Sequence, residues 1–252
     1  MKLIIQGEYA KEFEAIVAML KNFDTTGQPF GDGERNVIKL FDLKTTKVNI
    51  KRFKNPNLIN AFAYKFVRSS KAERSYTYGQ KLLSLGIGTP TPIAYAENSS
   101  VVGFKDSYYV SEHLACDLTY RELVHDPNYP EHETILRAFT DFTFRLHEAG
   151  VLFKDHSPGN TLIKKTDDGY QFYLVDLNRM TFKGLTMDER IANFERLSPK
   201  EEMVAVMSDQ YAKLVGLPYK QVFNPMWDLV QKFQEKYHRK VRLKKKYLFW
   251  RK

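Results

Sequence analysis

The residues best suited to do chemistry lie in the segment KDHSPGN, residues 154–160. Asp155 and Asn160 are five residues apart, a spacing found in phosphoryl-transfer loops where an Asp faces the acceptor hydroxyl and an Asn holds magnesium. Asp176 follows Asn160 by 16 residues, at the end of the apolar run YLVD, where a second carboxylate can bind a metal that bridges phosphates. Taken alone, the same three side chains also fit Asx turns and a strand end.

A lysine upstream strengthens the phosphoryl-transfer interpretation. Lys51 ends the β-like run VNIK, 18 residues after Gly33 and 104 before Asp155, about where a kinase places its phosphate-binding lysine. Lys54, in the RFK run that follows, is an alternative. Gly31 and Gly33 allow backbone amides to approach phosphate, although Gly-Asp-Gly is not the full glycine-loop pattern.

The order of the predicted elements indicates how these residues are positioned. The first part of the chain is rich in strands, the second in helices, and a small hairpin carries Asn160 and Asp176 at its two ends. Helices are predicted over 11–23, 60–85, a stretch ending near Gly150, and 186–240; strands are predicted over 36–41, 47–53, 107–114, 161–165 and 170–176. This order predicts an α+β chain with the bilobal layout of protein kinases.

We therefore expect three parts: an N-lobe over 1–114, a helical C-lobe over 115–238, and a basic aromatic tail over 239–252. The tail contains eight Lys or Arg and no acid, so residues 1–238 carry a net charge of only +1 out of the total of +9. Such a segment suits an anionic membrane surface or an acidic glycolipid. The alternative is a terminal helix that packs its aromatic side chains on the body and leaves its lysines in solvent.

Composition points to a reducing compartment. Cys116 is the single cysteine, so no intramolecular disulfide can form, and no Cys/His cluster predicts a zinc site. The N-terminus lacks the apolar core of a signal peptide, and no stretch approaches the ~20 apolar residues of a membrane span. We expect a cytoplasmic protein.

Six segments of the sequence resemble the lipopolysaccharide core kinases, the Kdo/heptose kinase or WaaP/InaA family. They are RNVIK (35–39), SSKAERSY (69–76), GIGTPTPIAYAE (86–97), SYYVSE (107–112), KDHSPGNTLI (154–163) and VDLNRM (175–180). The resemblance covers residues 31–182. It implies a protein-kinase-like fold, ATP and Mg²⁺ as cofactors, and a sugar of the lipid-linked inner core as acceptor, phosphorylated on the cytoplasmic side of the inner membrane.

The resemblance also implies residue roles. Asp155 would be the catalytic base, Asn160 and Asp176 the magnesium ligands, and Lys51 the lysine on the ATP phosphates. The backbone of the hinge Glu112-His113-Leu114 would bind adenine.

Two positions depart from the family pattern. Phe153 replaces the usual His before the catalytic loop, and Ser75 stands where many relatives have the helix Glu. Glu73 is the alternative ion-pair partner of Lys51, but two residues on a helix differ by ~200°, so both positions cannot face the same site.

We expect ATP and magnesium to bind between the lobes while Asp155 orients the acceptor hydroxyl. Three other functions fit part of the sequence: a kinase-like enzyme acting on a protein or small-molecule hydroxyl, a weakly active nucleotide-binding pseudokinase, and a non-catalytic polyanion binder. The last does not explain Asp155, Asn160 and Asp176, and the tail comes with no recognised nucleic-acid motif. We expect the basic tail either to hold an anionic lipid-linked saccharide near the site or to hold the enzyme, as a peripheral membrane protein, on the inner face of the inner membrane.

Overall fold

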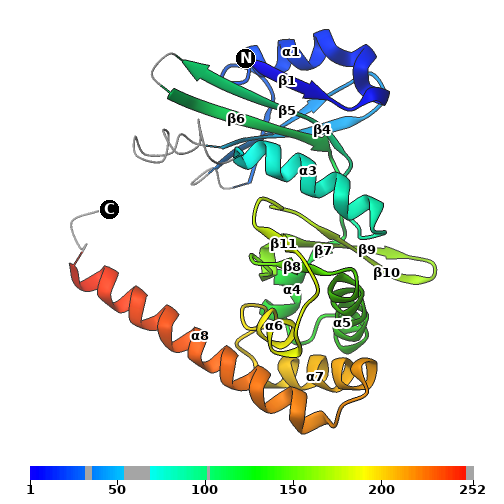
Figure 1. The fold of residues 1–252 in the computed structure, drawn as a ribbon, viewed down its shortest axis with the longest axis vertical. Coiled ribbons are helices and arrows are strands. Elements are labelled where there is room, and N and C mark those ends of the chain that lie inside the picture. Colours follow the sequence, from blue (N-terminus) through cyan, green and yellow to red (C-terminus); the bar gives the residue numbers. More distant parts are fainter. Residues whose placement is uncertain (32–35, 54–68, 101–102, 248–252) are drawn as a thin grey trace. The chain divides into compact units, whose positions relative to one another are not determined.

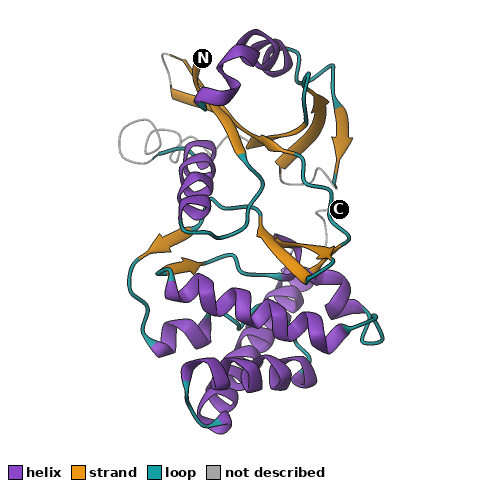
Figure 2. Cartoon of the chain, turned by 90° about the vertical axis from the view of Figure 1, so that its right-hand side faces the viewer, coloured by secondary structure: helices purple, strands orange, loops and turns teal. Residues whose placement is uncertain are grey.

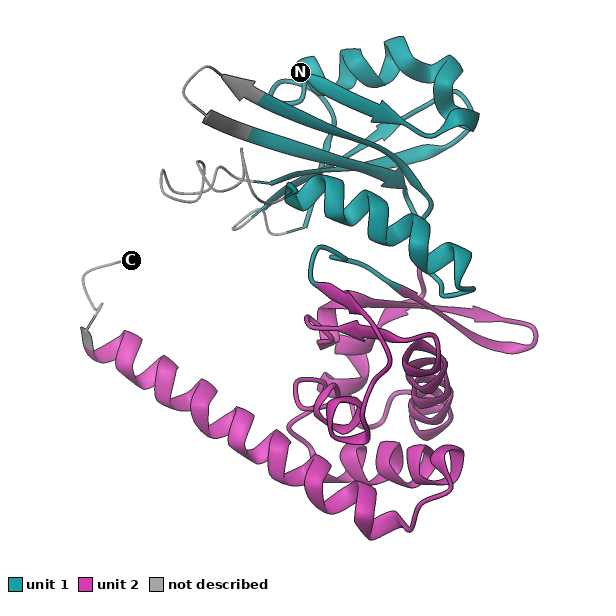
Figure 3. Ribbon diagram, viewed as in Figure 1, with its two compact units in different colours: residues 1–115, 174–179 teal, residues 116–173, 180–252 magenta. Residues whose placement is uncertain are grey.

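The computed structural model describes residues 1–31, 36–53, 69–100 and 103–247, which form two compact units (Figure 3). The first contains Met1–Ala115 and Leu174–Arg179, and the second contains Cys116–Tyr173 and Met180–Lys252. The short segment that carries Asp176 thus belongs with the first unit. Gly33, Lys54 and residues 60–68 of the helix predicted over 60–85 lie outside the described residues; Ser69 and Ser70 are not helical, so within the described part this helix begins at Lys71, later than predicted.

The first unit is built on a six-stranded antiparallel sheet (Figure 1). Its strands, in spatial order, are β1 (Lys2–Ile5), β5 (Pro92–Ser100), β6 (Gly103–Glu112), β4 (Lys47–Phe53), β3 (Asn36–Asp42) and β2 (Gln28–Phe30). The predicted hairpin is confirmed, because β3 and β4 pair from Asn36↔Phe53 to Asp42↔Lys47. The edge strands β1 and β2 were not predicted from the sequence.

Helices α1 (Phe13–Lys21) and α3 (Lys71–Ser84) pack against the sheet through two separate clusters. Ile16 of α1 joins Val48 and Ile50 of β4, whereas Tyr76 of α3 joins Phe53 of β4. Successive side chains of a strand point to opposite faces, so Lys51 shares the α3 face with Phe53. Lys51 lies 5.2 Å from the centroid of the Phe53 ring. The strand alternation therefore decides which face receives the lysine.

The second unit is mainly helical, as predicted (Figure 2). Its helices are α4 (Tyr120–His125), α5 (His132–Glu148), α6 (Met187–Ala192), α7 (Glu201–Val215) and α8 (Tyr219–Tyr247). Short strands form two small sheets: β7 (Leu118–Thr119), β9 (Thr161–Thr166) and β10 (Gly169–Leu174) in the order β10-β9-β7, and β8 (Val151–Phe153) with β11 (Met180–Phe182). The 3-10 helices η1 (Gly7–Glu12), of two turns, and η2 (Pro158–Asn160), of one turn, complete the elements.

Helix α5 forms the centre of the second unit's core. The predicted face is confirmed: Ile135, Phe139, Phe142 and Leu146 are all buried. Gly150 follows the helix at φ 69°, the left-handed conformation that ends helices, and its N–H donates to the His147 carbonyl at 2.9 Å. The chain then enters β8, which leads directly into the segment containing Asp155.

Helix α8 is the longest element, with 29 residues, and it continues through residue 239, where the tail was predicted to begin. Its first half buries Val222, Met226 and Val230, whereas most side chains from Glu235 to Lys246 are exposed. None of the helices in the described part of the chain is long and apolar enough to cross a membrane.

Candidate active site

In the first unit, Lys51 and Asp176 form a close ion pair. Lys51 Nζ lies 2.5 Å from Asp176 Oδ1, and the two side chains are 15% and 31% exposed. They are 125 residues apart in sequence. The sequence predicted both as phosphate-site residues, and the structure brings them together on the α3 face of the sheet. A partly buried lysine beside a partly buried carboxylate has the charges needed to bind phosphate and a metal ion.

The segment around Asp176 is held to the first unit by side chains that the sequence analysis had not assigned. The buried Arg74 of α3 donates through Nε to the Asn178 carbonyl at 3.0 Å, and Thr89 donates to the Leu174 carbonyl at 2.8 Å. Asn178 Nδ2 donates to Asp176 Oδ1 at 2.8 Å. These bonds explain how a short loop can hold a charged side chain in place.

Asp176 also has an unusual backbone. Its φ of 61° is in the left-handed region, which costs a non-glycine residue energy unless its surroundings impose it. Among the described non-glycine residues, only Glu131 shares this sign of φ. Backbone strain of this kind concentrates at functional sites. We infer that the bonds from Lys51, Arg74 and Asn178 maintain the conformation.

In the second unit, the catalytic-loop candidates are connected to each other. Asn160 Nδ2 donates to the Asp155 carbonyl at 2.8 Å and to Ser157 Oγ at 3.2 Å. With its nitrogen occupied in this way, the amide of Asn160 is oriented, and its oxygen is the atom left to serve as a metal ligand. The predicted spacing of five residues therefore corresponds to one hydrogen-bonded loop that orients Asn160 and contains Asp155.

Arg196 is a functional candidate that the sequence analysis missed. Its Nη1 donates to Asp155 Oδ1 and to the Lys154 carbonyl, both at 3.0 Å. The Asp155 side chain is 15% exposed. Arg196 lies 41 residues further along the chain, beyond α6, and no local pattern relates it to Asp155. We infer that Arg196 positions the carboxylate.

Arg196→Lys is expected to lower kcat about ten- to hundredfold with little change in the KM for ATP. The substitution keeps the charge but loses the rigid guanidinium geometry, and a hydrogen bond to a charged group contributes about 1.5–3 kcal/mol. Steady-state kinetics would check this, with the exposed Arg145→Lys in α5 as a matched control. Equal kcat values for the two variants would contradict a positioning role.

A second arginine lies over the same loop. The Nη2 of Arg121, in α4, is 2.5 Å from the point where a Cβ on Gly159 would be. Any larger residue at position 159 would have to displace Arg121. The glycine of the SPGN sequence therefore allows a cation to approach the loop closely.

Two buried histidines lie near Asp155: His156 in the loop itself and His147 in α5. Burial lowers the pKa of His156 to about 3 and that of His147 to about 4. His147 contacts Tyr211 Oη at 2.8 Å and Asn193 Oδ1 at 3.1 Å, and Asn193 Nδ2 donates to the Phe153 carbonyl at 2.8 Å. Both imidazoles are therefore neutral at pH 7 and carry no positive charge at the loop.

The helix position that usually pairs with the lysine is altered. Ser75 is buried and donates to the Lys71 carbonyl of its own helix at 2.9 Å. Glu73 accepts from Tyr95 Oη at 3.2 Å and lies 3.9 Å from Lys2 Nζ, so its carboxylate contacts these two residues and not Lys51. Among the described residues, the carboxylate paired with Lys51 is that of Asp176.

The predicted hinge lies at the end of β6. The Glu112 N–H donates to the Thr91 carbonyl at 2.9 Å, and the His113 N–H donates to the Lys47 carbonyl at 2.8 Å. The Glu112 carboxylate accepts a bond of 2.7 Å from Tyr9, and burial raises the pKa of this phenol. Leu114, half-buried, follows at the start of the connection to the second unit. The backbone of this segment is thus anchored on both sides.

Of the predicted glycine loop, the structure describes Gly31, which has a φ of 77°. A Cβ at this position would meet no other atom within 4 Å, so the glycine is needed for its backbone conformation and not for space.

Oxygen donors of the kind that Asp176 in the first unit and Asn160 in the second unit offer suit magnesium better than a softer metal. Asp176 supplies a carboxylate and Asn160 an amide oxygen, and Mg²⁺ prefers one or two such ligands together with substrate phosphates. In the part of the chain that the structure describes, no three His, Cys, Asp or Glu side chains form a metal cluster of their own.

Comparison with known proteins identifies the family. Residues 37–216 match the model of the lipopolysaccharide kinase (Kdo/WaaP) family, which is more than half of the chain. The chain belongs to this family, and the resemblance predicted from its motifs is confirmed. It is a lipopolysaccharide kinase, that is, a phosphotransferase with a sugar hydroxyl as acceptor, and kinase activity implies ATP as the donor. No curated protein matches the sequence.

A solved structure supports the predicted kinase-like fold. It is described as WaaP in complex with acyl carrier protein, and it matches with a TM-score of 0.64 and 15% sequence identity. The match covers 95% of this chain and 99% of the other. The α+β fold with a strand-rich first part and a helical second part is thereby confirmed.

Proposed function

We propose that this kinase transfers the γ-phosphoryl group of ATP to a hydroxyl of Kdo or heptose in the inner core of lipopolysaccharide. The observation that carries this proposal is the ion pair of 2.5 Å between Lys51 and Asp176. It joins the two residues that a kinase needs on the nucleotide side, although they are 125 residues apart in sequence.

The proposed reaction uses few protein groups. Asp155 accepts a hydrogen bond from the acceptor hydroxyl and orients its oxygen toward the γ-phosphorus. The oxygen–phosphorus bond forms as the bond to the β–γ bridging oxygen breaks, ADP leaves, and the hydroxyl proton passes to Asp155. Since the transition state is loose, positioning and charge stabilisation provide most of the rate enhancement.

The nucleotide is bound by residues of the first unit in this proposal. Lys51 exchanges part of its contact with Asp176 for the phosphate oxygens. The Glu112 carbonyl and the Leu114 N–H bind adenine, and Gly31 and Gly33 bring backbone amides close to the phosphates. Glu73 does not contact the nucleotide, because its carboxylate is engaged by Tyr95 and Lys2.

Asn160 and Asp176 would hold Mg²⁺, which when bound neutralises charge on the phosphates. Each ligand is oriented by the protein itself. The Asn160 nitrogen is bonded to the Asp155 carbonyl, and Asp176 is fixed by Lys51 and Asn178.

The direct test is ATP turnover by the purified protein with Mg²⁺, measured with and without a Kdo- and heptose-containing lipid A core acceptor. We expect turnover that depends on both the acceptor and Mg²⁺, with phosphate recovered on a sugar. Binding of MgATP without turnover on any core acceptor would exclude this acceptor, and failure to bind ATP would exclude the nucleotide site.

We also propose that the C-terminal part of α8 holds the enzyme on the anionic inner leaflet. Arg239, Lys240, Arg242, Lys244 and Lys245 are all exposed, and no acid follows Glu235 in α8. These exposed basic side chains support contact with an anionic surface. The aromatic residues Phe249 and Trp250 lie outside the described residues.

Lys244→Gln/Lys245→Gln is expected to weaken binding to vesicles of phosphatidylglycerol and phosphatidylcholine about thirtyfold. Each basic residue near an anionic surface contributes ~1 kcal/mol, so the two together contribute ~2 kcal/mol. Vesicle sedimentation would measure this, with Lys164→Gln/Lys220→Gln as a control at exposed positions. Equal binding by the two double variants would rule out this surface.

A further inference from the structure

Arg121 of α4 lies against the loop that contains Asp155 and Asn160. Its guanidinium lies over Gly159: Nη2, Cζ and Nε are 2.5, 3.4 and 3.7 Å from the point where a Cβ on that glycine would be. Gly159 is bonded to Asn160, whose side-chain amide donates to the Asp155 carbonyl at 2.8 Å. The guanidinium is therefore in contact with the loop itself, and all of these residues belong to the second unit.

The packing of α4 determines where Arg121 lies. Tyr120 is fully buried, with its ring centroid 4.4 Å from that of Phe139 in α5, and Leu123 is fully buried as well. Residues three apart share one face of a helix, so Tyr120 and Leu123 anchor α4 to the core. Arg121 lies outside this face and is exposed. Its backbone is thus held in place while its guanidinium can be reached by a ligand.

The positive charge of Arg121 is not neutralised by a neighbouring acid. No ion pair among the described residues involves Arg121. The carboxylate of the adjacent Glu122 accepts from the Thr119 N–H at 2.8 Å, in the capping box of α4. Arg196 differs from Arg121 in this respect, because it is bonded to Asp155. Arg121 is therefore open to an incoming anion.

We propose that Arg121 binds the carboxylate of an acidic acceptor sugar, and so makes the enzyme select Kdo, which carries a carboxylate, over heptose, which carries none. The inference rests on the proposed function and names the residue that decides between its two acceptors. In that reaction the acceptor hydroxyl lies at Asp155, so the sugar ring extends over the surface of the same loop, which Arg121 contacts at Gly159. A guanidinium can bind a carboxylate through two parallel hydrogen bonds.

Electrostatics gives the reason for a cation at this place. A carboxylate on the acceptor approaches the negative Asp155 and the phosphates of ATP during transfer, and like charges repel one another. In the proposed reaction Lys51 and Mg²⁺ serve the nucleotide, and Arg196 is bonded to Asp155. A neutral sugar brings no such repulsion. An arginine without an acidic partner at the loop therefore favours an acidic acceptor.

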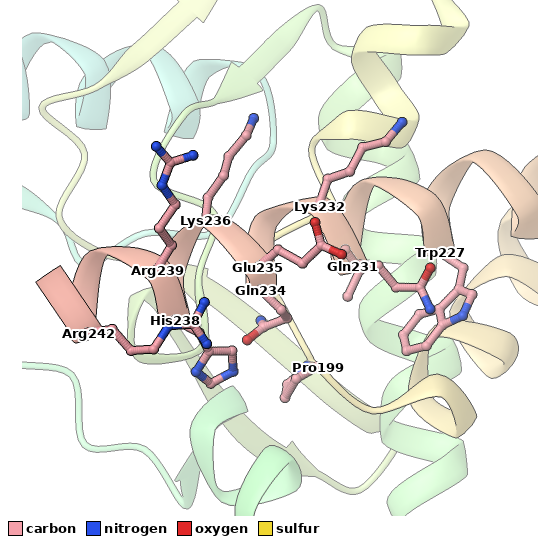
Figure 4. Close-up of a pocket in the computed structure, with 11 residues that line it drawn as sticks. Pro199, Trp227, Gln231, Lys232, Gln234, Glu235, Lys236, His238, Arg239 and Arg242 are labelled. Atoms are coloured by element: carbon pink, nitrogen blue, oxygen red, sulfur yellow. The ribbon is translucent and has the colours of Figure 1, made fainter.

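A second group of cations in this unit provides a control. Lys232, Lys236 and Arg239 of α8 are among the residues that line a hollow of about 890 Å³ (Figure 4). Of the described residues that line this hollow, none belongs to α4 or to the loop of residues 155–160. Lys232 is exposed, so its substitution removes a positive charge from the second unit without changing the loop.

The test uses a deacylated, phosphate-free core saccharide that contains Kdo. Arg121→Gln should raise the KM for this saccharide at least about tenfold, because a charge-assisted contact is lost, and should leave the KM for ATP unchanged. Lys232→Gln and Arg145→Gln, at exposed positions of α8 and α5, should leave both KM values at the wild-type level. When the Kdo carboxyl is reduced to an alcohol, wild type and Arg121→Gln should have the same KM.

Gly159→Ala tests the contact without removing the charge. The new Cβ requires the flexible end of Arg121 to move, so the KM for the saccharide should rise. In the Arg121→Gln background the same substitution should add little, because the guanidinium is already absent. Additive effects of the two substitutions would show that the two residues act independently, and would overturn the proposal.

Three other results would also overturn it. The first is an equal saccharide KM for Arg121→Gln and the two control variants. The second is a loss of affinity that persists with the carboxyl-reduced saccharide. The third is a rise in the KM for ATP alone, which would assign Arg121 to the nucleotide phosphates.

Calorimetric titration of the saccharide without ATP separates this inference from the proposed function. If wild type binds the saccharide and Arg121→Gln does not, the carboxylate site stands even where turnover is absent. If wild type turns over the saccharide but both proteins bind it equally, the function stands and the carboxylate site falls.

Discussion

Asp155→Asn is expected to lower kcat for phosphorylation of the core acceptor by about 10²–10⁴-fold, the usual contribution of a positioned general base. Asparagine keeps the shape of the side chain and can still accept the bond that Arg196 now gives to Asp155 Oδ1. The loop should therefore fold as before, with the Asn160 contact to the backbone carbonyl of residue 155 intact. What is lost is the negative oxygen that takes the proton.

The measurement is acceptor-dependent ADP formation, together with the affinity for MgATP. Asp168→Asn is the matched control, because Asp168 lies exposed in the β9–β10 turn of the same unit. We expect unchanged MgATP affinity in both variants and a rate loss in Asp155→Asn alone. If Asp155→Asn turned over within about threefold of wild type, the base would have to be another residue and the loop would serve only to hold Asn160.

The parts of the fold that could be predicted are those with strong local signals. Strand β3 is a mostly apolar run, β4 alternates apolar and polar residues from Val48 to Lys51, and α5 repeats its buried residues with helical spacing, so all three were recognised. Strand β1 has only four residues, and it becomes a strand by pairing with β5, from Lys2↔Glu97 to Ile5↔Ala94. Pairing over such a distance in sequence leaves no local pattern to detect.

The residues of the candidate site also differ in whether a local sequence pattern indicates them. Asp155, Asn160, Asp176 and Lys51 could be proposed from the sequence because their types and spacing follow a known chemical pattern. Arg196 was missed, because its role arises from a contact across 41 residues with no periodicity to indicate it. Arg74 was seen only as part of a family segment, and its bond to the Asn178 carbonyl depends on the tertiary fold.

The structure also changes the choice of partner for Lys51. The family pattern places a glutamate partner for the lysine on the helix that is α3 here. Because Ser75 occupies that position, the sequence left Glu73 as the alternative partner. In the fold, Ser70 caps the start of α3 by accepting from the Glu73 N–H at 3.0 Å, and the Glu73 carboxylate contacts Tyr95 and Lys2. Lys51 is instead paired with Asp176, the carboxylate that we propose as a magnesium ligand in the reaction.

Lys51→Met is expected to lower kcat/KM for ATP by about 10²–10³-fold, comparable to removing one preorganised charge donor at a transition state. Methionine fills the space of the lysine stem against Phe53 but removes the ammonium group. Asp176 then loses its bond of 2.5 Å and keeps the one from Asn178. Both the nucleotide phosphates and the proposed metal ligand are affected by this one change, which is why the expected loss is large.

The control is Lys44→Met, in the exposed turn of the same hairpin, which should leave kcat/KM unchanged. Lys51→Arg should be intermediate, because it keeps the charge but replaces a compact ammonium by a planar fork. Lys54→Met completes the series, since the sequence allowed Lys54 as the phosphate-binding lysine. A loss confined to Lys54→Met would move that role to position 54 and leave the pair of Lys51 and Asp176 as a structural contact that only holds the loop.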